Sequence, residues 1–316
     1  MVIPVVYAPP QLDELLESMG ESFDFQELVK LMFGLIDDFC RRQPKGKGPG
    51  RPKTYTDAVI LRLDMLMHLT GKRGETEILR EVKRHYRQYF PQLPAQPRLW
   101  YRIRDALPLI EAFRRHLCQQ LGATEEAVHI LDTMPLPVAL LESRPGQGNG
   151  FDLADWGHCA SKDLTYYGFK LGLLITQQGI PTTYDLFPAR PHDVRVIHDL
   201  LGDAADIIAL GDKGFISADT QALLEAEQDA LLITYRPRNQ HQQNSPLEQW
   251  TLNSFRRLIE TVFSQLDGHL HIQDTGAKTD VGLMKRVVGI LTAYTLGIYL
   301  NVLLGRPLLA IKELFA

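Results

Sequence analysis

The chain has 316 residues, of which 45% are hydrophobic and 23% are charged, a globular composition with room for one large or two modest domains. Its three cysteines, Cys40, Cys118 and Cys159, share no metal-ligand spacing. An odd number of cysteines without such spacing argues against a disulfide framework and against a cysteine zinc site. A reducing cytosol is therefore the expected environment. The N-terminus lacks a basic segment followed by an apolar core, so we expect no signal peptide.

The net charge of −4 hides an uneven distribution. Residues 41–117 contain 18 Lys and Arg against 7 Asp and Glu, a balance of +11, whereas the remainder contains 16 against 31, a balance of −15. A basic region beside an acidic one indicates a module that binds a polyanion, attached to a part with another task. Solvated helical faces are the alternative explanation.

The beginning of the chain is helical in pattern. Residues 10–40 place apolar side chains at helical spacing, and the basic, Gly- and Pro-rich stretch RRQPKGKGPGRPK follows at 41–53. That composition predicts a linker or a flexible arm that contacts DNA, with Arg51 and Lys53 as contacts.

Three short helices are expected after this linker. They run from a cap at Thr54 or Thr56 to about Leu69, from Glu75 to Tyr89, and from about Pro97 through a bend at Pro108. Three short helices with tight turns and excess positive charge are typical of a helix-turn-helix module. The arginines of the third helix are then expected to contact phosphates or guanine edges, namely Arg98, Arg102 and Arg104.

The pattern changes after about residue 122. In chain order we expect a strand, a hairpin, a helix, a strand, a helix, a strand and two helices, at 127–131, 166–189, 192–201, 206–210, 217–227, 230–235, around 254–266 and at 287–305. This order predicts an α/β domain around a mixed sheet and fits a ribonuclease-H-like core. We therefore divide the chain into a helical DNA-binding module, residues 1–122, and a catalytic domain, residues 123–316.

The uncharged stretch 287–305 is long enough to cross a membrane. It contains Gly, Thr and Asn, and it stands alone at the end of a polar chain, so we interpret it as a buried core helix.

Two aspartates occupy matching places in the predicted sheet. Asp132 and Asp212 each directly follow an apolar run, at the carboxyl end of a candidate strand. Active sites of α/β sheets gather at that edge. Asp also ends strands for turn reasons, so each residue taken singly is weak evidence.

A third acid, Glu260, lies in the helical stretch SFRRLIETVFSQL. At about 100° per residue, Glu260 falls beside the apolar stripe of that helix, where it could meet the edge of a sheet. The alternative is an ordinary ion pair with Arg256 one turn earlier, worth a few tenths of a kcal/mol. Three converging carboxylates would repel one another unless divalent metal lay between them, and Mg²⁺ or Mn²⁺ prefers such oxygen ligands. Two ions of this kind catalyse phosphoryl transfer.

The chain resembles bacterial insertion-sequence transposases of the DDE type, most closely the insertion-sequence-982 group. The resemblance covers about residues 50–305 and rests on ILDTMPLPV, YYGFKLGLLIT, GIPTTYDLFPARPHD, ALGDKGFIS, RRLIETVFSQL and FPQLPAQPRLWYRIR. It implies that Asp132, Asp212 and Glu260, separated by 80 and 48 residues, are the triad that binds two Mg²⁺ ions in a ribonuclease-H-like fold.

A signature of related transposases, Y-x2-R-x3-E-x6-K, is only half present. Arg256 and Glu260 match it, whereas Asn253 and Asp267 stand in the Tyr and Lys slots. The resemblance therefore implies that Arg256 contacts DNA. Arg257 and Lys213 are candidates to replace the missing lysine.

Other basic side chains of this domain are candidate DNA contacts. Lys213 could bind a phosphate beside the metals, with an exposed turn lysine as the alternative. Arg236 and Arg238 could touch the DNA backbone, with a solvated loop as the alternative.

By resemblance, the protein is expected to be a DNA transposase. It would cut double-stranded DNA at terminal inverted repeats and join the 3′-hydroxyl ends to target DNA by two-metal phosphoryl transfer. It would work in the cytoplasm, associated with the nucleoid, as a homodimer and without a membrane. A ribonuclease-H-like nuclease without strand transfer and a domesticated, non-catalytic DNA-binding protein remain as alternatives.

Overall fold

A computed structural model of the chain describes residues 25–44, 53–140, 150–159, 163–191, 197, 200–201, 207–215, 230–236 and 243–314. The chain divides into two compact units. The first contains the described residues of Met1–Leu121, with His269–His271 and Lys285–Ala316, and the second those of Gly122–Gly268, with Ile272–Met284. Residues 285–316, which the division made from the sequence places in the catalytic domain, thus group with the first unit.

The first unit is helical. It contains α2 (Phe25–Arg42), α3 (Asp57–Leu69), α4 (Glu75–His85), the 3-10 turn η1 (Arg87–Tyr89), α5 (Gln96–Asp105), α6 (Leu107–Gln120), most of α10 (Asp280–Leu303) and the 3-10 turn η4 (Lys312–Leu314). The predicted cap of α3 is confirmed, because the Thr56 hydroxyl accepts a hydrogen bond from Val59 N across 3.3 Å.

Two predicted helices of this unit differ from the structure. The helix expected to reach Tyr89 ends at His85, and η1 continues the chain as a single 3-10 turn. The expected bent helix is two helices that are separated at Ala106. The physical reason is Pro108, which lies in the first turn of α6 and has no N–H to continue the hydrogen-bond ladder of α5.

The long apolar helix α10 is a core helix, as predicted. Within the described ranges it is the one helix long and apolar enough to cross a membrane, but 89% of its apolar window is buried inside the structure. Leu291, Tyr294 and Leu300 are fully buried. Its polar residues Thr292 and Thr295 are also buried, and their hydroxyls donate to Val288 O and Leu291 O within the helix.

A buried charge cluster joins α10 to α4 inside the first unit. Lys285 Nζ donates to Glu75 Oε1, and Arg286 Nη2 donates to Glu75 Oε2 across 3.3 Å. Burial by itself would raise the pKa of Glu75, but the charges of Arg286 and Lys285 outweigh it and lower the pKa below its usual value. Since a buried charge without a partner is costly, these three residues stabilise one another.

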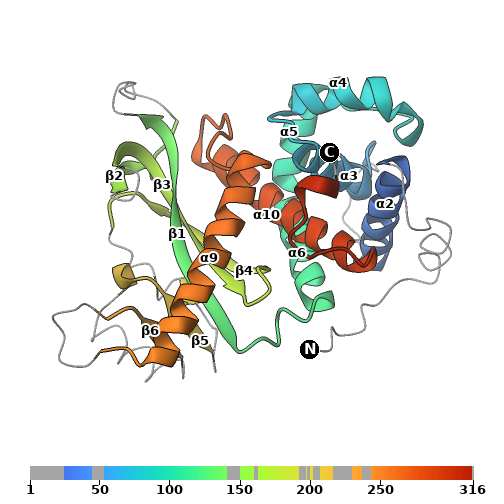
Figure 1. The fold of residues 1–316 in the computed structure, drawn as a ribbon. Helices are drawn as coiled ribbons and strands as arrows, with labels where there is room; N and C mark the ends of the chain where they lie inside the picture. The colour runs from blue at the N-terminus through green and yellow to red at the C-terminus, as the bar shows by residue number, and fades with distance from the viewer. Residues whose placement is uncertain are drawn as a thin grey trace. The chain divides into compact units, whose positions relative to one another are not determined.

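The second unit is built on a mixed six-stranded sheet (Figure 1). Its elements are β1 (Val128–Leu140), β2 (Asp155–Cys159), β3 (Leu164–Thr176), β4 (Pro181–Pro188), β5 (Ile208–Gly211), the 3-10 turn η3 (Lys213–Phe215), β6 (Leu231–Thr234) and α9 (Pro246–Gly268). The strands lie in the order β2-β3-β1-β5-β6, and β4 also pairs with β3. The early strands pair antiparallel and β1, β5 and β6 pair parallel, which makes the mixed sheet that the sequence predicted, whereas β2 was not predicted.

Strand β1 is much longer than the strand predicted at 127–131. The predicted end of this strand was wrong. It continues to Leu140 because β3 pairs with it from His129↔Thr176 to Leu140↔Tyr166. Two prolines lie within β1: Pro135 pairs with Lys170 in register, whereas the register shifts between Pro137 and Ala139. The carbonyl of Pro135 accepts from Gln273 Nε2 across 2.6 Å, so this residue's backbone faces away from β3, where a missing N–H costs the sheet nothing.

The two faces of the sheet are covered differently. Leu131, Ala209 and Leu232 face a core that includes Ile197 and Leu200. Because side chains alternate along a strand, their neighbours Ile130 and Leu210 point to the opposite face. Helix α9 packs there, against β1 and β5, as Figure 1 shows. Its buried Leu252 and Ile259 close that side of the second unit.

Candidate active site

Asp132 and Asp212 stand at the same level of two neighbouring parallel strands. The pairing of β1 with β5 is Val128↔Ile208 through Leu131↔Gly211, so the next residue on each strand is an aspartate. Because the pairing is parallel and in register, both side chains leave the same face of the sheet. The matching places that the sequence predicted are therefore neighbours in space.

Both aspartates line a small pocket between the sheet and α9. Its volume of about 30 Å³ has room for one or two water-sized ligands. The polar part of its lining is Asp132, Asp212, Tyr235 and Arg256, and the apolar part is Ile130, Leu131, Leu210, Gly211, Leu252, Phe255 and Ile259. Two carboxylates thus share a partly enclosed space with one guanidinium.

The backbone around each aspartate is ordered by local hydrogen bonds. Asp132 Oδ1 accepts from Thr133 N across 2.7 Å, within the long strand β1. Asp212 follows the last residue of β5, and its carbonyl accepts from Phe215 N across 3.1 Å, which closes the turn η3. The predicted position at a strand end holds for Asp212, while Asp132 lies inside β1 where its pairing with β5 stops.

Glu260 is placed on α9 as predicted, beside the buried Ile259 and Val262. Its carboxylate does not line the pocket and is 57% exposed. Arg256 Nε donates to Glu260 Oε1 across 3.0 Å, so the expected ion pair exists. This hydrogen bond, followed by the charge of Asp212, raises the pKa of Arg256. The guanidinium therefore acts electrostatically on Asp212 as well as on Glu260.

The two aspartates meet and the glutamate remains apart. Within the parts of the chain that the structure describes, no three His, Cys, Asp or Glu side chains form a group that could hold a metal ion. The chemistry of the pocket nevertheless fits a hard divalent cation, because paired carboxylates are its preferred ligands. Glu260 would reach such an ion only by releasing Arg256, and a side chain more than half exposed has the room to do so.

Tyr235 belongs to this site and was missed as a candidate. It directly follows β6 and lines the pocket with the two aspartates. The signal was available in the sequence. Tyr235 follows an apolar run at the end of ALLITY, just as Asp132 and Asp212 each follow an apolar run. Asn253, in the tyrosine slot of the signature, accepts a hydrogen bond from the Tyr235 hydroxyl across 3.0 Å.

The other basic candidates of the second unit are placed unevenly. Arg257 is exposed on α9, one residue after Arg256. Arg236 is half-buried, and its backbone N–H donates to Asn244 Oδ1 across 2.7 Å. Arg238 and the side chain of Lys213 lie outside the described part of the chain.

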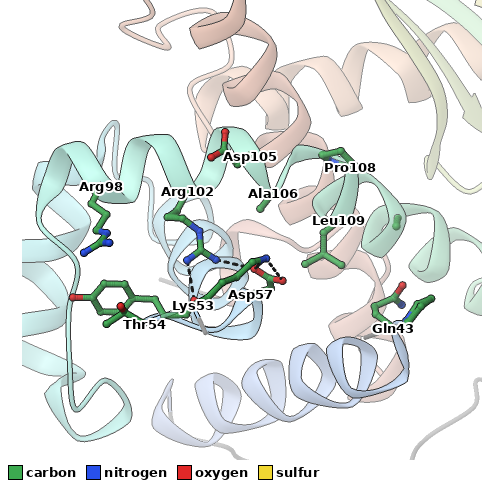
Figure 2. Close-up of a pocket in the computed structure, with 13 residues that line it drawn as sticks. Gln43, Lys53, Thr54, Asp57, Arg98, Arg102, Asp105, Ala106, Pro108 and Leu109 are labelled. Carbon is green, nitrogen blue, oxygen red and sulfur yellow. Dashed lines mark hydrogen bonds and ion pairs between the residues drawn. The ribbon is translucent and has the colours of Figure 1, made fainter. Parts of the chain in front are cut away.

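In the first unit, Lys53, Arg98 and Arg102 line one pocket of about 860 Å³ (Figure 2). Arg102 donates to Tyr55 O across 2.9 Å and to Asp57 Oδ1 across 2.8 Å, and Lys53 pairs with the same carboxylate across 2.8 Å. These two cations therefore brace the start of α3. The exposed Arg98 instead lies over the Tyr55 ring, 5.9 Å from its centroid.

Arg104 and Arg51 complete the predicted set. The Arg104 guanidinium donates to Asp105 Oδ1 and stacks 5.0 Å from the centroid of the Tyr101 ring. Tyr101 is 53% exposed, so this pair presents a cation and an aromatic face to solvent. Arg51 lies outside the described residues.

Comparison with protein families shows that residues 130–296 match a family described as the transposase DDE domain. The matched range covers more than half of the chain and includes Asp132, Asp212 and Glu260. No curated protein and no solved structure matches the chain.

Proposed function

Because this chain belongs to the transposase DDE domain family, we propose that it cuts DNA at the terminal inverted repeats of an insertion sequence and joins the 3′-hydroxyl ends to target DNA. The observation that carries the proposal is the in-register placement of Asp132 and Asp212, which brings two carboxylates into one pocket under α9. The insertion-sequence-982 group and a ribonuclease-H-like core remain part of the proposal.

Asp132 and Asp212 would hold divalent metal, Mg²⁺ or Mn²⁺, and Glu260 would complete the ligand set. When bound there, such ions would supply Lewis-acid stabilisation of the phosphoryl group and of the attacking and leaving oxygens. Arg256 has a task before any DNA arrives. Its positive charge interacts with Asp212 and would offset part of the repulsion between the two carboxylates.

Arg256 would bind and orient the DNA strand. Its Nε–H is directed at Glu260, and a guanidinium has four further N–H donors in a planar fork that matches phosphate geometry. A phosphate that binds this fork competes with Glu260 for the same guanidinium. DNA binding would therefore weaken the Arg256–Glu260 pair and turn the glutamate toward the two aspartates.

The first unit would bind the terminal repeats. Supporting this are its basic excess, the exposed Arg98 and the partly exposed Arg104, which lies over the ring of an exposed tyrosine. Helix-turn-helix docking of α5 and a homodimer that holds two DNA ends are the finer parts of the proposal.

The test is Mg²⁺-dependent cleavage of a labelled duplex that carries the inverted repeat flanking the coding sequence. We expect Asp132→Asn and Asp212→Asn to lose cleavage while keeping the wild-type melting temperature and DNA affinity. Asp163→Asn is the matched control, because that carboxylate is 99% exposed in the same unit and its positive φ of 45° suits asparagine. Full cleavage by Asp132→Asn would show the catalytic assignment to be wrong.

Joining of the labelled 3′ end to a plasmid separates the alternatives. Cleavage without joining would indicate a nuclease, and repeat-specific binding without cleavage would indicate a non-catalytic DNA-binding protein.

A further inference from the structure

A third polar side chain stands at the level of the two aspartates. The pairing of β5 with β6 is Ile208↔Leu231 through Gly211↔Thr234, so the residue level with Asp212 is Tyr235. Asp132, Asp212 and Tyr235 therefore form a row across three adjacent parallel strands, on the face that α9 covers. All three line the same pocket.

The backbone on either side of Tyr235 is clamped by a buried asparagine. Asn244 Nδ2 donates to Thr234 O across 3.0 Å, and Asn244 Oδ1 accepts from Arg236 N across 2.7 Å. The amide of Asn244 thus continues the pairing of β6 as a further strand would. Since Asn244 is only 8% exposed, this clamp is part of the folded unit and holds Tyr235 at the edge of the pocket.

The hydroxyl of Tyr235 contacts the face of α9 that carries Arg256 and Glu260. It donates to Asn253 Oδ1 across 3.0 Å, and Asn253 precedes Arg256 and Glu260 by three and seven residues, the spacing of one helix face. Partial burial raises the pKa of Tyr235; Arg256 opposes this shift, and the charges of Asp212 and Glu260 add to it. The phenol therefore keeps its proton at neutral pH and remains a donor.

We propose that Tyr235 is a DNA-binding residue of the active site, whose hydroxyl donates a hydrogen bond to a non-bridging oxygen of a substrate phosphate next to the two aspartates. This inference rests on the proposed function. A phosphodiester that approaches two carboxylates is repelled by them, and a neutral donor in the same row attracts it without adding charge. Exchanging the amide of Asn253 for a phosphate gives the hydroxyl a charged acceptor, and such hydrogen bonds are about twice as strong as neutral ones.

A purely structural task is the competing explanation, because the Tyr235–Asn253 hydrogen bond also ties β6 to α9. Two variants separate the explanations. Tyr235→Phe and Asn253→Ala both remove this bond, but only Tyr235→Phe removes the hydroxyl. Tyr167→Phe is the matched control, because Tyr167 is a half-buried tyrosine of the same unit whose ring packs, tilted, against Trp156, outside the pocket.

The measurement is the affinity of each variant, by fluorescence anisotropy, for the repeat duplex and for copies in which single phosphates are replaced by neutral methylphosphonates. We expect Tyr235→Phe to bind about 10- to 100-fold more weakly, the usual effect of losing a hydrogen bond to a charged group. Asn253→Ala and Tyr167→Phe are expected to change affinity less than about threefold. One methylphosphonate position should weaken the wild type and leave Tyr235→Phe unaffected.

Equal losses in Tyr235→Phe and Asn253→Ala, or no phosphate position that distinguishes Tyr235→Phe from the wild type, would overturn the inference. This assay measures DNA binding and not cleavage. The proposed function is tested separately, because an Asp132→Asn variant that still cuts DNA would refute it.

Discussion

Arg256 Nε donates a hydrogen bond to Glu260 Oε1 across 3.0 Å, one turn further along α9. The two side chains are 54% and 57% exposed, so solvent screens the pair and its contribution to stability is small. At the same time the charge of Asp212 acts on Arg256. A weak, exposed pair next to two clustered aspartates is better suited to exchange partners than to hold the fold.

Arg256→Lys tests this exchange. It keeps the positive charge but loses the planar fork, so we expect Mg²⁺-dependent cleavage to fall about tenfold or more while the free energy of unfolding changes by less than about 0.5 kcal/mol. Cleavage assays and urea unfolding measure the two effects. Arg190→Lys is the control, since Arg190 is an 80% exposed arginine of the same unit, outside the pocket. Equal losses in both variants would contradict the assigned role.

Arg98 and Arg102 are expected to behave differently although both line the pocket of Figure 2. Arg98→Ala should reduce the slope of log affinity for DNA against log salt by about 0.9, the value for one lost phosphate contact, and Arg98→Lys should restore it. Arg102→Ala should instead lower the free energy of unfolding by about 1–3 kcal/mol, because Tyr55 O and Asp57 lose the Arg102 donors, although Asp57 keeps its pair with Lys53. An unchanged salt slope in Arg98→Ala would show that Arg98 makes no phosphate contact.

Gly289 allows α10 to pack closely against α3 in the first unit. A Cβ there would lie 2.4 Å from His68 Nε2 and 3.0 Å from Asp64 Oδ2, and both side chains are buried. We expect Gly289→Ala to lower the free energy of unfolding by about 1–3 kcal/mol, the usual cost of overpacking a core. Gly34→Ala in α2 is the control: its Cβ meets nothing within 4 Å, so it should stabilise by about 0.5–1 kcal/mol. Similar urea midpoints for both variants would contradict the packing.

We expect His129 to make the stability of the second unit depend on pH. Burial on β1 lowers the pKa of His129 below the ordinary value of about 6.5 that it regains on unfolding. Above that value both states are neutral; as the pH falls below it, the unfolded chain binds a proton that the folded chain does not, and stability falls by at most about 1.4 kcal/mol per pH unit. Urea unfolding at a series of pH values measures this slope.

His129→Gln should therefore lose stability less steeply than the wild type between about pH 6.5 and the lowered folded value. The buried His68 acts in the same direction, because burial lowers its pKa too, so a residual slope is expected in the variant. His158→Gln, at a 52% exposed side chain, should keep the wild-type curve. Parallel curves for His129→Gln and the wild type would contradict the assignment.

Local patterns in the sequence were enough to predict much of the second unit. The apolar runs before Asp132, Asp212 and Tyr235 form the first part of β1, β5 and β6, in that order, and the amphipathic period around Glu260 is α9. These predictions succeed because strand and helix periodicity is a property of neighbouring residues. The end of β1 was missed, because it depends on pairing with β3 rather than on the residues 132–140 themselves.

By itself, the sequence determined the residue types of the site, the strand and helix that present them, and the basic character of residues 41–117. Tertiary structure alone decided which residues meet. The register of β1, β5 and β6 brings Asp132, Asp212 and Tyr235 into one row. Register, like the grouping of residues 285–316 with the first unit, follows from contacts between segments far apart in the chain, which no local period encodes.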